Sequence, residues 1–232
     1  MTVRHWLGSG GNWTTAADWT GGVVPGSMGG AIIDAIGSYT VSENPSSKAP
    51  IGVASIEISA GVVLAINGVT GNKVGLGGVT NNGELALGGK AALTINGAFA
   101  DSGTLDLDTN SGDGGGSLTI SGALDNTGAL QVGSSVGNLS AATTLTLGGL
   151  DNSGHIALYG GSPTVMATLA VAGPTSNSGT IAIGSNSILD VTGGNAFTQT
   201  AGTTTVHGML TAATISIDGG KLIVDTTKFT NW

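Results

Sequence analysis

The sequence predicts an all-β fold, a single-stranded parallel β-helix in which short coils stack around one continuous core. Two observations carry this prediction. A turn signal of the form Asn/Asp-x-Gly, followed by alternating apolar residues, recurs along most of the 232-residue chain. No stretch of ten residues keeps a helical apolar pattern without a glycine break. Repeats of roughly 20 to 50 residues, each too small to bury its own apolar face, are typical of solenoids.

The first predicted strand of each repeat follows the turn signal directly. The signal reads NNGELAL, DSGTLDL, NTGALQV, NSGHIAL and NSGTIAI, beginning at Asn81, Asp101, Asn126, Asn152 and Asn177, with a weaker copy, TAGTTTV, around Gly202. Equivalent residues of stacked strands lie about 4.8 Å apart, so this strand predicts two interior columns. They are Leu85, Leu105, Leu130, Ile156 and Ile181, and beside them Leu87, Leu107, Val132, Leu158 and Ile183.

A second short strand follows the first in each repeat and predicts two more columns. One contains Leu93, Leu118, Leu145, Leu169, Leu189 and Ile215, and the other contains Ile95, Ile120, Leu147, Val171, Val191 and Ile217. We expect a third corner of each coil to be filled by Phe99, Leu124, Leu150 and Phe197. Coils of this length favour a right-handed parallel β-helix, although the periodicity itself does not encode handedness.

The first 50 residues differ from the rest and contain Trp6, Trp13 and Trp19. The end of a solenoid exposes apolar columns and strand edges, so atypical terminal segments usually act as caps. We therefore predict a Trp-rich N-terminal cap, and favour it over a platform on which carbohydrate stacks. Residues 1–50 are assigned to the cap and first strands, and residues 51–232 to the repeats of one continuous domain.

Composition excludes several classes of function. The 43 glycines gather at turns rather than at every third position, which excludes collagen. A net charge of −8 repels phosphate, so nucleic acid is not an expected partner. No apolar run approaches the roughly 20 residues of a membrane-spanning helix, and we expect no membrane insertion. The absence of cysteine excludes disulfides and Cys-based metal sites.

The residues predict neither an active site nor a cofactor. The three histidines, His5, His155 and His207, are far apart in sequence and are interpreted as surface residues. Asp106 and Asp108 are expected to point to the same outward side, but the equivalent positions of the adjacent repeats, Ala86, Gln131 and Ala157, add none of the acidic or basic partners that a glycosidase or lyase requires. We therefore expect a protein that is not an enzyme.

Calcium is the best metal candidate, through oxygen ligands bunched in one Gly-rich loop. The weak candidate ligands are Asp106, Asp108, Asn110 and Asp113. Ser111 and Ser117 stand where an EF-hand loop needs Gly and Glu, and Asp113 precedes the glycines instead of following them. The pattern therefore matches neither type of calcium-binding loop.

The outward positions of the second strand carry small hydroxyl residues. Those that would form a flat face are Thr94, Thr119, Thr144, Thr146 and Thr168. Such a face could bind ice or a polysaccharide, and it is equally compatible with ordinary β-propensity. Ile188 and Asp190 interrupt the pattern.

The C-terminal segment ISIDGGKLIVDTTKFTNW keeps alternating apolar residues to its end. Uncapped solenoid ends pair readily with another chain. We therefore expect a homo-oligomer or filament, with Phe229 and Trp232 anchoring the self-association. The alternative is that this aromatic tail folds over its own last coil.

The opening W-x-G-x-G-G-N-W-x-x-x-x-x-W-x-x-G-x-x-P-G, from Trp6 to Gly26, precedes AIIDAIGSYTV and then the N-x-G-x-L-x-L repeats. This arrangement resembles the β-helical passengers of autotransporter-type and haemagglutinin-like surface adhesins of Gram-negative bacteria. The resemblance implies an extracellular or cell-surface structural protein, an adhesin or fibre subunit. The first residues lack the charged and then apolar segments of a signal peptide, so export by another route is expected. A surface-binding module is the alternative, and a polysaccharide-active enzyme is least favoured.

Overall fold

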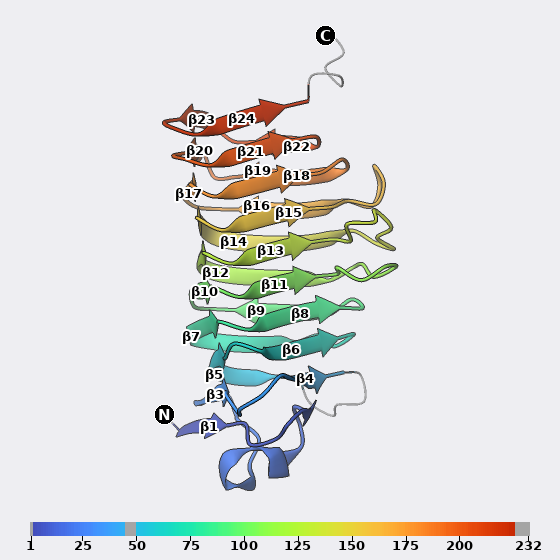
Figure 1. The fold of residues 1–232 in the computed structure, drawn as a ribbon, viewed down its shortest axis with the longest axis vertical. Helices are drawn as coiled ribbons and strands as arrows, with labels where there is room; N and C mark the ends of the chain where they lie inside the picture. Colours follow the sequence, from blue (N-terminus) through green and yellow to red (C-terminus); the bar gives the residue numbers. More distant parts are fainter. Residues whose placement is uncertain (1, 45–49, 226–232) are drawn as a thin grey trace.

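The computed structural model describes residues 2–44 and 50–225. The chain winds into a β-solenoid of about nine turns, with the N-terminal cap at one end and β24 at the other (Figure 1). The paired strands are parallel, and helical structure in the described residues is limited to two 3-10 turns, η1 (Ala16–Asp18) and η2 (Thr20–Gly22). The predicted all-β parallel solenoid is confirmed. None of the helical segments in residues 2–44 and 50–225 is long and apolar enough to cross a membrane.

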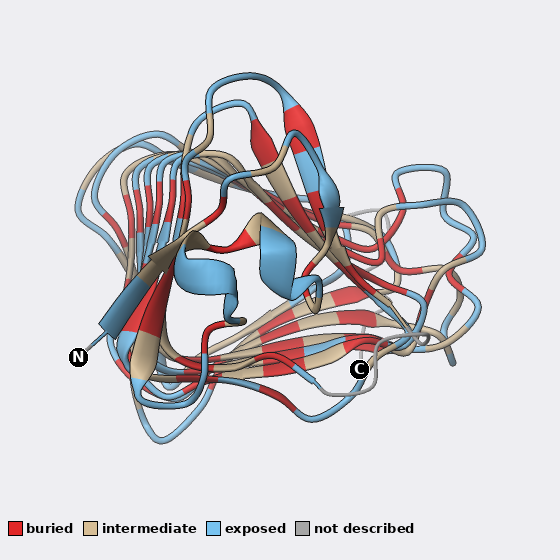
Figure 2. Cartoon of the chain, turned by 90° about the horizontal axis from the view of Figure 1, so that it is seen from below, coloured by how far each residue is buried: buried red, intermediate tan, exposed pale blue. Residues whose placement is uncertain are grey.

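Each coil has three sides, which give the solenoid a triangular outline when it is viewed along its axis (Figure 2). The first face is the ten-stranded sheet formed by the strands after the turn signal. Its strands are β2 (Gly11–Asn12), β4 (Tyr39–Glu43), β6 (Val62–Asn67), β8 (Glu84–Gly88), β11 (Thr104–Leu107), β13 (Ala129–Val132), β15 (His155–Leu158), β18 (Thr180–Ile183), β21 (Thr203–Val206) and β24 (Lys221–Val224).

The other two faces belong to one fourteen-stranded sheet that folds around a corner. The strands that contribute to both faces are β5 (Gly52–Ile58), β7 (Asn72–Asn81), β12 (Ser117–Asn126) and β14 (Thr143–Asn152). The second face adds β9 (Ala92–Ile95), β16 (Ala167–Val171), β19 (Ser187–Val191) and β22 (Met209–Thr211). The third face adds β1 (Thr2–His5), β3 (Gly29–Ile33), β10 (Phe99–Asp101), β17 (Thr175–Asn177), β20 (Ala196–Gln199) and β23 (Thr214–Ile217).

The predicted interior columns are present on the first two faces. Leu105 lies between Leu85 and Leu130 on the first face. On the second face, Leu118 lies between Leu93 and Leu145. These side chains are buried and form one continuous apolar core along the solenoid axis.

Two members of the predicted second-strand columns are wrong. Leu189 is followed on the second face by Leu210 of β22, not by Ile215. Ile215 instead aligns with Phe197 on the third face, and Ile217 aligns with Gln199. The alternating segment TISI resembles the second strands of earlier coils, so it was assigned to the second face. β22 was not recognised in the sequence because it has only three residues and a single inward apolar side chain.

The residues expected to fill a third corner form a column on the third face. Phe99 aligns with Leu124, and Leu124 aligns with Leu150. The column continues through Thr175 to Phe197. The sequence therefore placed these residues correctly inside the coil but did not predict the third face.

Close stacking of the turns explains why the turn signal ends in glycine. A Cβ atom on Gly128 would lie 2.2 Å from the carbonyl oxygen of Gly103, and one on Gly154 would lie 2.2 Å from that of Gly128. Non-bonded atoms cannot approach so closely, so any other residue would push the coils apart. At these positions the close approach of the backbone, rather than a positive φ, requires glycine.

The N-terminal end is closed by the predicted tryptophan cap. Trp6, Trp13 and Trp19 are at most 2% exposed, and the ring of Trp19 packs edge-to-face on the other two with centroids 5.0 and 4.8 Å apart. Figure 2 shows the two 3-10 turns lying across this end of the solenoid. Because the three rings are buried, they are not available to stack on carbohydrate. Stacked strands already begin inside the first 50 residues, with β1 to β4.

Candidate functional site

The predicted hydroxyl residues do come together on the outer side of the second face. Thr119 aligns with Thr94 on one side and with Thr146 on the other. In the neighbouring column, Thr144 aligns with Ser117 and with Thr168. Adjacent strands are about 4.8 Å apart and alternate residues of a strand about 6.7 Å apart, so these half-buried side chains form a regular, uncharged grid.

The grid has sharp limits. Ala170 follows Thr146 in its column, and Asp190 follows Ala170. Ile188 follows Thr168 in the other column. Below Thr94 the column continues with Lys73. The hydroxyl face therefore covers the middle coils only, and both of its columns end in residues of different chemistry.

The Asp-rich loop is organised by one buried carboxylate. The expectation that Asp108 points outward beside Asp106 is wrong, because Asp108 follows the end of β11 with a positive φ of 53° and its side chain is fully buried. Its Oδ2 accepts hydrogen bonds from the Gly116 N–H at 2.7 Å and the Thr143 hydroxyl at 2.6 Å. Burial raises its pKa, while these two hydrogen bonds lower it. Asp108 thus fastens the loop before β12 to strand β14 of the next coil.

The other weak calcium candidates have separate environments. Asp106 lies on the outer side of β11, where burial and the neighbouring carboxyl of Glu84 raise its pKa to about 6. Asn110 donates a hydrogen bond to Asp113 at 3.3 Å. In the part of the chain that the structure describes, no three His, Cys, Asp or Glu side chains are placed to hold one metal ion.

The three histidines lie on different parts of the surface. His5 contacts Asp34 at 3.0 Å, and His207 contacts Asp225 at 3.3 Å. His155 is exposed on the outer side of β15. Each histidine therefore belongs to a local surface arrangement rather than to a shared site.

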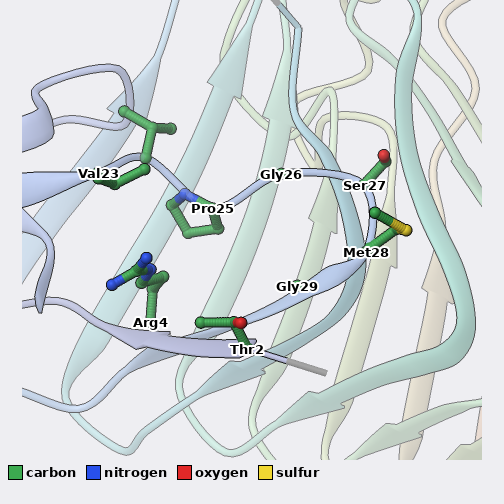
Figure 3. Close-up of a pocket in the computed structure, with 9 residues that line it drawn as sticks. Thr2, Arg4, Val23, Pro25, Gly26, Ser27, Met28 and Gly29 are labelled. Carbon is green, nitrogen blue, oxygen red and sulfur yellow. The ribbon is translucent and has the colours of Figure 1, made fainter. Parts of the chain in front are cut away.

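A concave surface beside the N-terminal cap encloses about 320 Å³ (Figure 3). Its walls include Arg4, Val23, Pro25 and Met28. The Arg4 guanidinium donates a hydrogen bond to the Thr20 carbonyl oxygen at 2.9 Å, which ties this side chain to the cap. The hollow combines apolar walls with one tethered cation, and it is open to solvent.

A second hollow of about 320 Å³ lies at the opposite end, in the last coil. It is lined by apolar side chains that face the solenoid axis, among them Leu210, Ile215, Leu222 and Val224. Ile215 is 42% exposed and Val224 is 39% exposed, although their counterparts in earlier coils are buried. The described part of this end therefore leaves the apolar interior open.

A buried polar ladder, which was not predicted from the sequence, lies beside the turns of the third face. Its rungs are the first residues of successive turn signals: Asn81, Asp101, Asn126, Asn152 and Asn177, followed by Gln199. Side-chain amides donate from Asn81 to Asp101 at 2.8 Å, from Asn126 to Asn152 at 2.6 Å, from Asn152 to Asn177 at 2.6 Å and from Asn177 to Gln199 at 3.0 Å. The recurrence of Asn at this one position of each signal was the available clue.

The ladder has one break, between Asp101 and Asn126. These residues are aligned across adjacent strands. Asp101 Oδ2 and Asn126 Oδ1 are both buried, and neither has a hydrogen-bond partner among the described residues. Burial raises the pKa of Asp101 to about 6, against the opposing effect of the hydrogen bonds from Asn81 and Gly103.

Neither a family model, nor a curated protein, nor a solved structure matches this chain. The proposed function therefore rests on the fold and on the chemistry of its surface.

Phe229 and Trp232, the expected anchors of self-association, lie outside the described residues. The apolar hollow formed by the last coil lies within the described residues.

Proposed function

We propose that this chain is a non-enzymatic structural protein, an extracellular spacer or adhesin of the kind present on bacterial surfaces. The observation that carries the proposal is the continuous parallel stacking of the coils around one apolar core. Ten strands on the first face correspond to a rod about 43 Å long, at about 4.8 Å per strand. A rod of this kind holds its outer faces at fixed spacing and orientation, as a spacer or adhesin requires.

The resemblance of the Trp-rich opening to adhesin passengers supports the same proposal. A location outside the cell and a surface polysaccharide as ligand are parts of it. The net charge of −8 favours neutral or cationic surfaces over anionic ones.

The test measures retention and turnover on the same materials. The labelled full chain is applied to cellulose, chitin and neutral glucan surfaces, with the unfolded chain as control. We expect the folded chain alone to be retained, without release of reducing sugars. Release of soluble products by the folded chain would identify an enzyme and overturn the proposal, and absence of retention on every surface would remove its adhesive part.

The regular hydroxyl grid favours ice or crystalline-surface binding as a second candidate function. Because Thr119 and Thr146 are adjacent and point outward, we expect Thr119→Lys/Thr146→Lys to reduce ice-recrystallisation inhibition or retention on crystalline polysaccharide at least tenfold while the fold persists. Thr198→Lys, on the outer side of the third face, is the matched control. Equal activity of both variants would exclude the grid as the binding surface.

A further inference from the structure

The two ends of the solenoid offer different surfaces to another protein. At the N-terminal end, the backbone N–H of His5 is bound by the Thr20 hydroxyl at 3.0 Å, and that of Leu7 by the Asp18 carbonyl oxygen at 2.7 Å. The cap thus occupies the edge that a further strand would need. At the other end, β22, β23 and β24 are the last strands of their faces in the described chain. A head-to-tail filament through strand pairing is therefore disfavoured.

Among residues 2–44 and 50–225, no strand pairs with the outer edge of β24, and the hydrogen bonds on its inner edge define which backbone groups point outward. The N–H groups of Lys221 and Asp225 donate to the Gly202 and Val206 carbonyl oxygens of the previous coil, at 2.9 and 3.0 Å. The backbone groups of alternate residues in a strand point to opposite edges. Those of Leu222 and Val224 therefore point away from the solenoid, toward whatever covers the last coil.

Residues 221 to 225 are Lys, Leu, Ile, Val and Asp. When two copies of this segment run antiparallel, the basic residue of one lies opposite the acidic residue of the other, and apolar residues lie opposite apolar residues. Leu222 and Val224 continue the interior columns above Thr204 and Val206, whereas Lys221 and Ile223 face outward. An antiparallel pair of β24 strands centred on Ile223 places Leu222 opposite the partner's Val224. It also places each Lys221 opposite the partner's Asp225.

In this register, the backbone groups and the side chains of the two β24 strands both form favourable pairs. Leu222 and the partner's Val224 form a hydrogen-bonded pair through the N–H and C=O groups that point away from the previous coil in each strand. Lys221 and Asp225 carry opposite charges on the outer side, and opposite charges across an antiparallel pair are stabilising. Asp225 lies on this outer side, where its Oδ2 contacts His207 Nδ1 at 3.3 Å.

The two-fold axis that relates the β24 strands also fits the rest of the coil. Rotating a three-sided coil about an axis through its first face exchanges the second and third faces. β22 of each copy then lies opposite β23 of the other, and the inward Leu210 faces the partner's Ile215. The two apolar hollows close against each other, and the exposed Ile215 and Val224 become buried.

We propose that the C-terminal coil is a dimerisation surface whose partner is a second copy of this chain, joined tail to tail by antiparallel pairing of β24. Such an interface is isologous and closed, so it gives dimers rather than filaments. The inference concerns the end of the rod and does not depend on what the outer faces bind.

A charge exchange in the full 232-residue chain tests the register. We expect sedimentation equilibrium to give twice the 22.4 kDa chain mass. Lys221→Glu and Asp225→Lys each place like charges opposite one another at two symmetric positions, which should raise the dissociation constant about tenfold or more. The double variant restores both pairs and should recover dimerisation. Lys73→Glu, on the second face far from this end, is the control.

A single cysteine tests the two-fold axis independently, because the chain contains none. Residues opposite one another in a non-hydrogen-bonded antiparallel pair have Cα atoms about 4.5 Å apart, within the range of a disulfide. Oxidised Ile223→Cys should therefore form a covalent dimer. Thr205→Cys, one coil below on the same face, should not. A monomeric wild type, growth into filaments, charge variants with unchanged affinity, or equal cross-linking of both cysteine variants would overturn the proposal.

Discussion

Replacing Leu118 with aspartate is expected to unfold the solenoid. Leu118 is 1% exposed and lies between Leu93 and Leu145 in the second-face column. Removal of a buried leucine side chain costs about 2 to 5 kcal/mol, and a buried carboxylate without a partner adds several kcal/mol more. Each coil is supported only by its neighbours, so a defect in the middle of the stack removes support on both sides.

Thr119→Asp is the matched control for Leu118→Asp. Thr119 is the next residue of β12, and its half-buried side chain points outward between Thr94 and Thr146. Its hydrated carboxylate should cost about 1 kcal/mol or less, as surface substitutions usually do. Urea denaturation followed by circular dichroism measures both changes. Similar midpoints for the two variants would contradict the assignment of inward and outward positions.

The solenoid is expected to lose stability as the pH rises from about 4 to 8, because two buried carboxyls bind their protons more tightly in the folded state than in the unfolded state. Glu43 is fully buried, and neither of its side-chain oxygens has a hydrogen-bond partner among the described residues. Burial raises its pKa from 4.5 to about 7. The folded state thus binds this proton more tightly than the unfolded state, and stability falls between these two pH values by about 3 kcal/mol.

The raised pKa of Asp101 also makes the stability of the solenoid fall as the pH rises, over a slightly lower pH range. Its pKa is raised from 3.8 to about 6, so its contribution of about 3 kcal/mol is lost as the pH rises through that interval. Protonated at Oδ2, Asp101 can donate to the unpartnered Oδ1 of Asn126 and complete the polar ladder. The carboxylic acid then replaces the amide that occupies this position in the next three coils.

Replacement of the two buried carboxyls by neutral amides tests this pH dependence. In urea titrations at pH 4 and pH 8, Glu43→Gln/Asp101→Asn should lose most of the wild-type decrease in unfolding free energy. Asp106 and Asp108, whose pKa values are also raised, account for the remainder. Asp125→Asn removes one exposed charge from the outer side of the third face and is the control. An unchanged decrease in the double variant would contradict the assignment of these two protons.

The sequence predicts those interior columns in which the same type of residue recurs at the same position of each coil. Leu105 and Leu118 belong to columns of the same residue type, and alternation alone identifies their inward side. The third face was missed because its column mixes Phe99, Leu124 and Thr175, and because β12 and β14 continue onto it from the second face without a break. A register shift at Ile120 to Ala123 also breaks the alternation there.

The polar ladder could not be predicted from local rules, because Asn is favoured at turns whether or not it is buried. The turn explains why Asn152 is polar, and only the stacking of coils explains why it is buried. The hydroxyl face was predictable because Thr119 and Thr146 alternate with buried leucines. The self-complementary edge of β24 required knowledge of which groups of Lys221 and Asp225 bind the previous coil.

The corners of the coil differ in the sequence changes that they tolerate. At Gly128 and Gly154 even a methyl group would collide with the turn below, so every side chain larger than that of glycine is excluded there. The connections between the first and second faces instead vary in length, as between β11 and β12, β13 and β14, and β15 and β16, and they project from one side of the outline in Figure 2. Peptides grafted at this variable corner would be displayed in a single row, at multiples of the strand spacing, on a scaffold whose pitch the opposite corner fixes.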